Sequence, residues 1–184
     1  MQDTTKLALS HFEIYVSDAR RMEDFYTRVL GFVVTDRGAG AGGLIFLSRN
    51  PDEHHQIVLN PNPARTGDGQ RVDHLSFRVP SLSDLRAYYR RLGAEPGSGA
   101  DTVSHGSTWS IYFRDPEGNR LELFVDTPWY VNQPCRFPVD LELDDESLAR
   151  STEEMIRDMP GFRPASEWRH SHAEQVSGGS RDGS

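Results

Sequence analysis

The stretch LALSHFEIYVSD at residues 7–18, followed by RMEDFYTRVLG at 21–31, decides the fold because the chain repeats its pattern. The second copy reads VDHLSFRV at 72–79 and LSDLRAYYRRLG at 82–93. Each copy combines a strand-forming segment that carries a histidine, a short turn and an amphipathic helix that stops at glycine. An internal repeat of this kind predicts two equivalent structural modules.

Further strands are expected after each repeated helix. In the first copy they fall at residues 32–35, 44–48 and 54–59, and in the second near 94–96 and at 108–114 and 120–125. The two modules, 7–60 and 71–126, therefore share the order βαβββ and are joined by a segment rich in Pro and Gly. The sequence predicts an α+β domain over 7–126, in which the paired βαβββ modules form one incomplete barrel around a metal-binding cavity.

The remaining third of the chain is expected to be an accessory region. Residues 127–163 predict an arm and a helix that pack on the domain, with the helix at about 144–159 closed by Pro160 and Gly161. Residues 164–184 are polar and predict a disordered tail.

Composition narrows the functional classes. The chain has 184 residues, 36% hydrophobic, and a formal net charge of −8. This balance argues against a nucleic-acid partner, which requires a basic face. No apolar run is long enough to cross a bilayer and the N-terminus does not read as a secretory signal, so we expect no membrane partner. A single cysteine fits a reducing compartment, and we expect a cytoplasmic protein.

Three residues are candidate metal ligands. His11 and His74 occupy equivalent points of the two copies, and Glu122 lies within the apolar run LELFV at 121–125. A carboxylate in such a strand is costly unless it is paired or bound to a metal. Two imidazoles and one carboxylate on one face suit Fe(II) with open coordination positions, and Mn(II) also accepts this ligand set. The alternative interpretation is that the histidines are ordinary strand residues.

The repeat breaks at the place that corresponds to Glu122. In the first module this place falls within the apolar segment 57–59. A fourth protein ligand is therefore missing. An open, three-ligand site favours coordination of a substrate over the caging of a structural ion.

Three further residues are candidates for catalysis. Strand alternation places His55 on one face with Ile57 and Leu59, where an imidazole beside the metal suits proton transfer. The alternative for His54 and His55 is an exposed pair in a turn.

Tyr112 and Glu122 are expected on adjacent strands of one hairpin, so the phenol either faces the same cavity or packs as an ordinary aromatic residue. His105 precedes that strand, in a loop expected at the cavity mouth.

These residues resemble the vicinal oxygen chelate superfamily, which includes glyoxalase I, fosfomycin-resistance transferases, bleomycin-binding proteins and type I extradiol dioxygenases. The resemblance rests on the duplicated βαβββ unit and on the ending YFRDPEGNRLE at 112–122. Within the superfamily, HH at 54–55 and DH at 73–74 resemble the ring-cleaving extradiol dioxygenases. The chain has one pair of βαβββ modules, and in this it is similar to the single-domain members of that family.

The resemblance implies specific roles for these residues. It implies iron ligation by His11, His74 and Glu122, acid–base catalysis by His55 and substrate contact by Tyr112. A further active-site histidine of that family falls near His105, although the loop spacing differs.

The implied activity is insertion of both atoms of O2 into a small aromatic diol at Fe(II), and we expect a homo-oligomer. Three alternatives remain, namely a glyoxalase-like lyase, a fosfomycin-type thiol transferase and a metal-free drug-binding module. The apolar segment 57–59 counts against the lyase, which would need a fourth ligand there.

Overall fold

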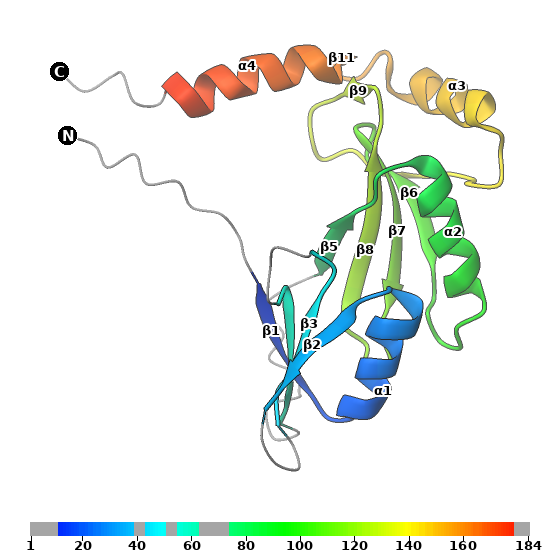
Figure 1. Ribbon diagram of the computed structural model, residues 1–184. Coiled ribbons are helices and arrows are strands. Elements are labelled where there is room, and N and C mark those ends of the chain that lie inside the picture. The colour runs from blue at the N-terminus through cyan, green and yellow to red at the C-terminus, as the bar shows by residue number, and fades with distance from the viewer. Residues whose placement is uncertain (1–10, 39–42, 51–54, 63–73, 179–184) are drawn as a thin grey trace.

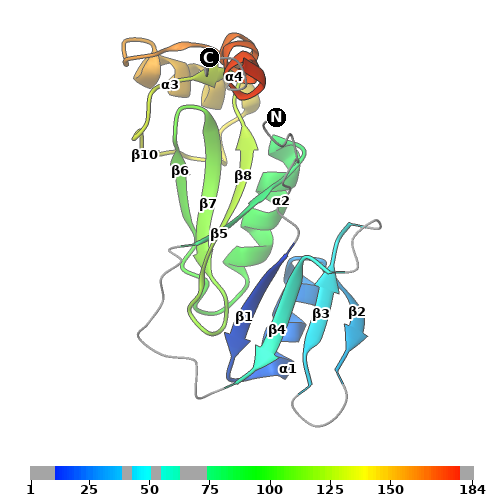
Figure 2. The same cartoon turned by 90° about the vertical axis from the view of Figure 1, so that its left-hand side faces the viewer.

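Two separate β-sheets, each covered by helix on one face, make up most of the chain (Figure 1). The computed structural model describes residues 11–38, 43–50, 55–62 and 74–178. The sheets follow one another along the long direction of the molecule, and the C-terminal helices lie at the far end of the second sheet (Figure 2).

The first module has the predicted order βαβββ. Its elements are β1 (Phe12–Val16), α1 (Ala19–Asp24), the π-helical turn η1 (Phe25–Val29), β2 (Val33–Arg37), β3 (Ile45–Ser48) and β4 (Ile57–Pro61). The sheet order is β1-β4-β3-β2, with β1 and β4 parallel. Asp18 caps α1 by accepting the Arg21 backbone N–H at 3.0 Å.

The second module repeats the arrangement. Its elements are β5 (Leu75–Arg78), α2 (Leu82–Gly93), β6 (Asp101–Ser104), β7 (Thr108–Arg114) and β8 (Arg120–Asp126). The sheet order is β10-β6-β7-β8-β5, and β5 is parallel to β8 as β1 is to β4. Each helix packs on the apolar face of its own sheet, so that most of the buried residues form one continuous core.

The prediction of a strand at 94–96 was wrong. These residues form a turn, in which the Ser98 N–H donates to the Glu95 carbonyl and Gly97 has a φ of +77°. The second strand of this module is instead β6, whose residues pair with β7. Proline and two left-handed glycines favour a turn before Ala100, whereas the following Asp101–Ser104 segment meets an unpaired edge of β7.

The C-terminal region contributes five elements beyond the repeat. They are β9 (Trp129–Tyr130), β10 (Phe137–Pro138), α3 (Asp145–Ile156), β11 (Arg163–Pro164) and α4 (Ala165–Gly178). The expected amphipathic helix is α3. It is joined to the domain by a buried hydrogen bond of 2.9 Å from Trp109 Nε1 to Thr152 Oγ1.

The predicted disorder from residue 164 differs from the structure, because α4 occupies 165–178. The Trp168 ring stacks on Tyr130 with a centroid separation of 4.9 Å, and Arg169 forms an ion pair with Asp126. These contacts join a polar helix to β9 and β8, and neither contact leaves a periodic signal in the sequence.

The two modules are joined by polar contacts between their turns and helices. The Glu117 carboxylate accepts the backbone N–H groups of Ser17 and Asp18 at 2.6–2.9 Å. Arg28 forms an ion pair with Glu95 at 2.5 Å. Among the described strands none of the first sheet pairs with one of the second, so the sheets do not close into a barrel. None of the described helices has the length and apolar character needed to cross a membrane.

Candidate metal centre

A polar cluster lies on the face of the second sheet that is turned away from α2. Tyr112 is directly opposite Glu122 in the β7–β8 register, and Ser76 is opposite Glu122 in the β5–β8 register. Both Tyr112 and Glu122 are 7% exposed. The alternating residues Leu121 and Leu123 point to the core, so the strand period alone delivers the carboxylate to this face.

Two histidines converge on this carboxylate. His74 Nε2 is 3.5 Å from one Glu122 oxygen, and His105 Nε2 is 3.9 Å from the other. Two ligands of one metal ion at bond lengths of roughly 2.1 Å and at a right angle would be about 3 Å apart. The donor types and the spacing of His74 and Glu122 therefore fit a shared metal ion, and metal ligation by this pair stays a prediction.

Tyr112 occupies the middle of the cluster. Its ring meets those of His74 and His105 edge-on, with centroid separations of 5.3 and 5.9 Å, and its hydroxyl is 3.1 Å from His105 Nε2. Burial, together with the neighbouring Glu122 carboxylate, raises the pKa of the Tyr112 hydroxyl well above its usual range. The phenol is therefore held as a neutral hydrogen-bond donor beside the carboxylate.

The surroundings of Tyr112 include residues that the sequence reasoning missed. Ser76 donates its hydroxyl hydrogen to Glu122. Arg120 and Arg136 lie over the Tyr112 ring, with their guanidinium carbons 4.3 and 5.9 Å from its centroid. Alternation within β5 and β8 could have found Ser76, which lies opposite Glu122, whereas Arg136 comes from the C-terminal arm and carries no such signal.

The other predicted site residues lie together in the first module. The rings of His11 and His55 meet edge-on at 4.3 Å, and His55 also contacts Phe46 at 5.2 Å. The register of the sheet places Phe46 beside Val58, on the face opposite to the core residues of β3 and β4.

This position of His55 differs from the alternation argument, which grouped it with Ile57 and Leu59. Those two residues are fully buried in the core, while β4 begins only at Ile57, so that strand alternation does not govern the direction of His55. His54 lies outside the described residues.

The structure brings His74 and Glu122 together but does not bring His11 to them. In the described part of the chain no three His, Cys, Asp or Glu side chains are arranged to hold a metal ion. The predicted ligands are thus divided into a His74–Glu122 half on the second sheet and a His11 half on the first. The complete ligand set remains a prediction.

The registers also identify the break in the repeat. Glu13 faces Val58 in the first module as Ser76 faces Glu122 in the second, and each facing pair begins two residues after the module's histidine. Val58 is therefore the counterpart of Glu122. The structure agrees with the expected apolar residue at this place.

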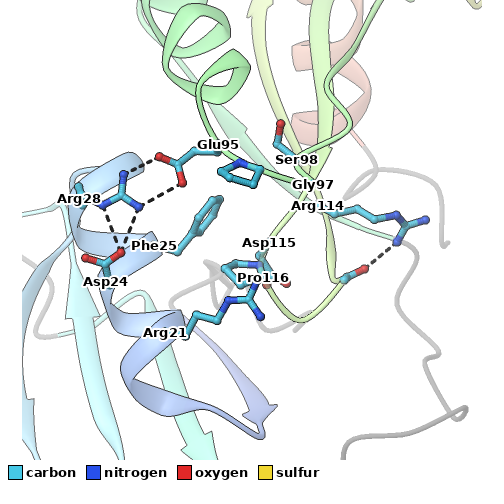
Figure 3. A pocket seen from close by; sticks show the side chains of 12 residues that line it. Arg21, Asp24, Phe25, Arg28, Glu95, Gly97, Ser98, Arg114, Asp115 and Pro116 are labelled. Carbon is cyan, nitrogen blue, oxygen red and sulfur yellow. Dashed lines mark hydrogen bonds and ion pairs between the residues drawn. The ribbon is translucent and has the colours of Figure 1, made fainter.

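The junction between the modules contains a separate cavity of about 380 Å³ (Figure 3). It lies between α1 with η1 on one side and the turns at the base of the second sheet on the other. Arg28 on its wall is paired with both Asp24 and Glu95, and Arg114 donates to the Gly118 carbonyl. None of the predicted site residues lines this cavity.

Comparison with known proteins identifies several relatives that are named as dioxygenases of aromatic diols. Biphenyl-2,3-diol 1,2-dioxygenase 3 of Rhodococcus globerulus is 35% identical over 127 residues, which are 64% of this chain and 63% of that protein. Biphenyl-2,3-diol 1,2-dioxygenase 2 of the same organism is 31% identical over 169 residues, 83% of this chain and 86% of the relative. The catechol-2,3-dioxygenase of Bacillus subtilis is 28% identical over 65% of this chain and 42% of its own length.

Solved structures are similar in fold. A glyoxylase/bleomycin resistance protein/dioxygenase domain from Frankia sp. EAN1pec matches 67% of this chain and all of that one, with a TM-score of 0.56 and 26% identity. The Glyoxalase/Bleomycin resistance protein/Dioxygenase superfamily profile matches residues 8–123, which include both modules and the cluster around Glu122. The chain therefore belongs to the glyoxalase/bleomycin resistance/dioxygenase superfamily.

Proposed function

We propose that this chain is an extradiol ring-cleaving dioxygenase that inserts both atoms of O2 into a catechol-type substrate at a non-haem Fe(II) centre. The observation that carries the proposal is the buried Glu122 carboxylate between His74 and His105, with the Tyr112 hydroxyl beside it. The diol dioxygenases among the relatives support the substrate class. Fe(II), when bound, supplies open positions for the diol and for O2 and a route for electrons between them.

The residues of the second sheet would hold the metal and orient the diol. His74 and Glu122 would supply two ligands, and the Ser76 hydroxyl holds one Glu122 oxygen in place. Tyr112, kept protonated by its raised pKa, would donate a hydrogen bond to a substrate oxygen. This arrangement contributes placement and charge compensation on a face whose carboxylate is almost fully screened from solvent.

Metal binding and turnover test the proposal together. Anaerobic reconstitution with Fe(II), followed by catechol or 2,3-dihydroxybiphenyl in air, should give a yellow ring-fission product. Glu122→Gln should lose both iron and turnover, whereas Glu142→Gln, at an exposed carboxylate in the loop before α3, should keep both. Retained iron without product across a panel of catechols would instead favour a lyase or a transferase, and no iron uptake would favour a metal-free binding module.

His55 is proposed as the acid–base group. His55→Ala should retain iron and lose turnover by about 10²–10⁴-fold, the contribution typical of a positioned proton donor. His170→Ala provides a matched control on the exposed surface of α4. Full ring-cleavage activity in the His55 variant would remove this residue from the mechanism.

His11 is proposed as the third ligand, and its separation from His74 and Glu122 bears on the oligomer. Within the described residues the edge strands β1 and β5 each pair on one side only, which leaves room for a second copy. Mixing and refolding His11→Ala with Glu122→Gln tests whether the site uses two chains. Restored turnover would assign His11 to the partner chain, and an inactive mixture would assign all three ligands to one chain.

A further inference from the structure

The arm that follows β8 wraps around the turn that carries His105. Thr127 donates its backbone N–H to the Ser107 carbonyl at 2.9 Å and its hydroxyl to the Gly106 carbonyl at 2.6 Å. The Gln133 side-chain amide donates to the His105 carbonyl at 2.8 Å. Three successive carbonyls of the turn are thus bound by the arm, so the position of the turn depends on it.

The arm also binds the His105 ring itself. His105 Nδ1 is 2.7 Å from the Cys135 carbonyl oxygen. A carbonyl can only accept a hydrogen bond, so Nδ1 must carry the hydrogen. In the neutral ring Nε2 then has the lone pair, and it lies 3.1 Å from the Tyr112 hydroxyl. The contact with the arm therefore selects one tautomer and directs its basic nitrogen toward the site.

Gln133 holds both parts of this arrangement. Its amide nitrogen donates to the His105 carbonyl, while its amide oxygen accepts the Cys135 backbone N–H at 3.0 Å. The Cys135 side chain is buried against Met159, with the two sulfur atoms 3.6 Å apart, which fixes the residue from the other side. One side chain thus sets the distance between the His105 turn and the carbonyl that its ring binds.

We infer that Gln133 and the Cys135 carbonyl are positioning groups that fix the orientation and tautomer of His105, leaving its Nε2 as a hydrogen-bond acceptor that faces Tyr112 and Glu122. The part that concerns catalysis rests on the proposed dioxygenase function: Nε2 would accept a hydroxyl hydrogen of a bound diol. The tautomer itself follows from the contacts of the arm and requires no metal or substrate.

The tautomer can be measured in metal-free, full-length protein. Long-range ¹H–¹⁵N NMR of uniformly labelled protein identifies the ring nitrogen that carries the hydrogen. His105→Asn assigns the signal. Wild type should show hydrogen on Nδ1 alone, and Gln133→Ala should show a mixture of the two tautomers. Hydrogen on Nε2 in wild type, or an unchanged spectrum in Gln133→Ala, would overturn the inference.

Two further variants distinguish a positioning role of Gln133 from a general loss of packing or folding. Cys135→Ala removes the buried thiol but keeps the backbone carbonyl, so the Nδ1–H tautomer should persist. Gln133→Glu keeps an oxygen that can accept the Cys135 N–H and replaces the amide donor to the His105 carbonyl by a charged acceptor. It serves if the alanine variant fails to fold, and it should also mix the tautomers. Loss of the tautomer in Cys135→Ala alone would assign the effect to core packing instead.

Turnover distinguishes this inference from the proposed function. With Fe(II) and an accepted catechol, Gln133→Ala should lower kcat by about 10-fold or more with little change in KM, as is typical of partners that orient an active-site group. Wild type with the expected tautomer but no ring cleavage would contradict the proposed function and leave the positioning role intact. An active wild type and an equally active Gln133→Ala with mixed tautomers would contradict the catalytic part of the inference.

Discussion

Replacement of Gly106 by alanine should weaken the packing of the arm on the His105 turn and lower the stability of the protein. Gly106 has a φ of +74°, and a Cβ built on it would lie 2.4 Å from Val131 Cγ2. The left-handed conformation costs a non-glycine residue roughly 1–2 kcal/mol. Forcing a methyl group into this packed contact adds about 1–3 kcal/mol. We expect Gly106→Ala to lower the free energy of unfolding by about 2–5 kcal/mol.

Gly97→Ala is the matched control for the backbone cost. Gly97 has a similar φ of +77°, but its Cβ would meet no atom within 4 Å. This variant should lose only the conformational part, about 1–2 kcal/mol. The difference between the two variants therefore measures how tightly the arm packs on the turn.

Urea denaturation followed by circular dichroism and tryptophan fluorescence provides the measurement. The two probes should give one transition, since a divergence would mean that the arm detaches before the domain unfolds. Equal losses for Gly106→Ala and Gly97→Ala, within the uncertainty of the extrapolation, would refute the reasoning. They would mean that the arm yields to the added methyl group without cost.

Three further perturbations test other contacts. Thr152→Val leaves the buried Trp109 N–H without an acceptor and should cost about 1–3 kcal/mol in urea unfolding, while Thr152→Ser should cost little. Glu117→Ala removes the carboxylate that binds two backbone N–H groups before α1 and should cost about 1–2 kcal/mol, with Glu117→Gln retaining part of the contact. Burial, with Asp115 nearby, raises the pKa of Tyr26, so wild-type stability should fall above about pH 10, when the unfolded state ionises more readily. Tyr26→Phe should lose less over the same range, and a constant difference between the two proteins would contradict this.

The features that were predictable from the sequence are local ones. Asp18 and Ser81 begin their helices, and each accepts the backbone N–H of the residue three positions later. The alternation along β8 places Glu122 opposite to its apolar neighbours. A short-range pattern is sufficient because both devices act within a few residues. His55 shows the limit of this reasoning, because a residue just outside a strand does not follow the strand's period.

The contacts of the C-terminal arm could not be predicted because they join distant residues through backbone groups. His105 is 30 residues from the carbonyl that its ring binds, and any residue type at 135 would supply that carbonyl. Likewise, nothing in the sequence around Gln133 indicates that its amide binds the His105 turn. Sequence patterns report side-chain chemistry and the spacing of side chains. A site that depends on backbone acceptors therefore cannot be recognised from them.

The same distinction explains why candidate ligands could be predicted from the sequence while their arrangement in space could not. The repeat makes His11 equivalent to His74, and the strand registers make Val58 equivalent to Glu122. The strand alternation of each module therefore specifies its own faces. How the modules meet depends instead on contacts between residues far apart in the sequence, among them the Phe25–Phe113 ring contact and the Glu117 carboxylate on the turn before α1. Such contacts are replaceable by others of similar free energy, whereas the strand faces are not. The identity of the metal ligands therefore stays a prediction that iron reconstitution of the Glu122 variant tests, and the chain from which His11 comes is a separate question for the mixing experiment.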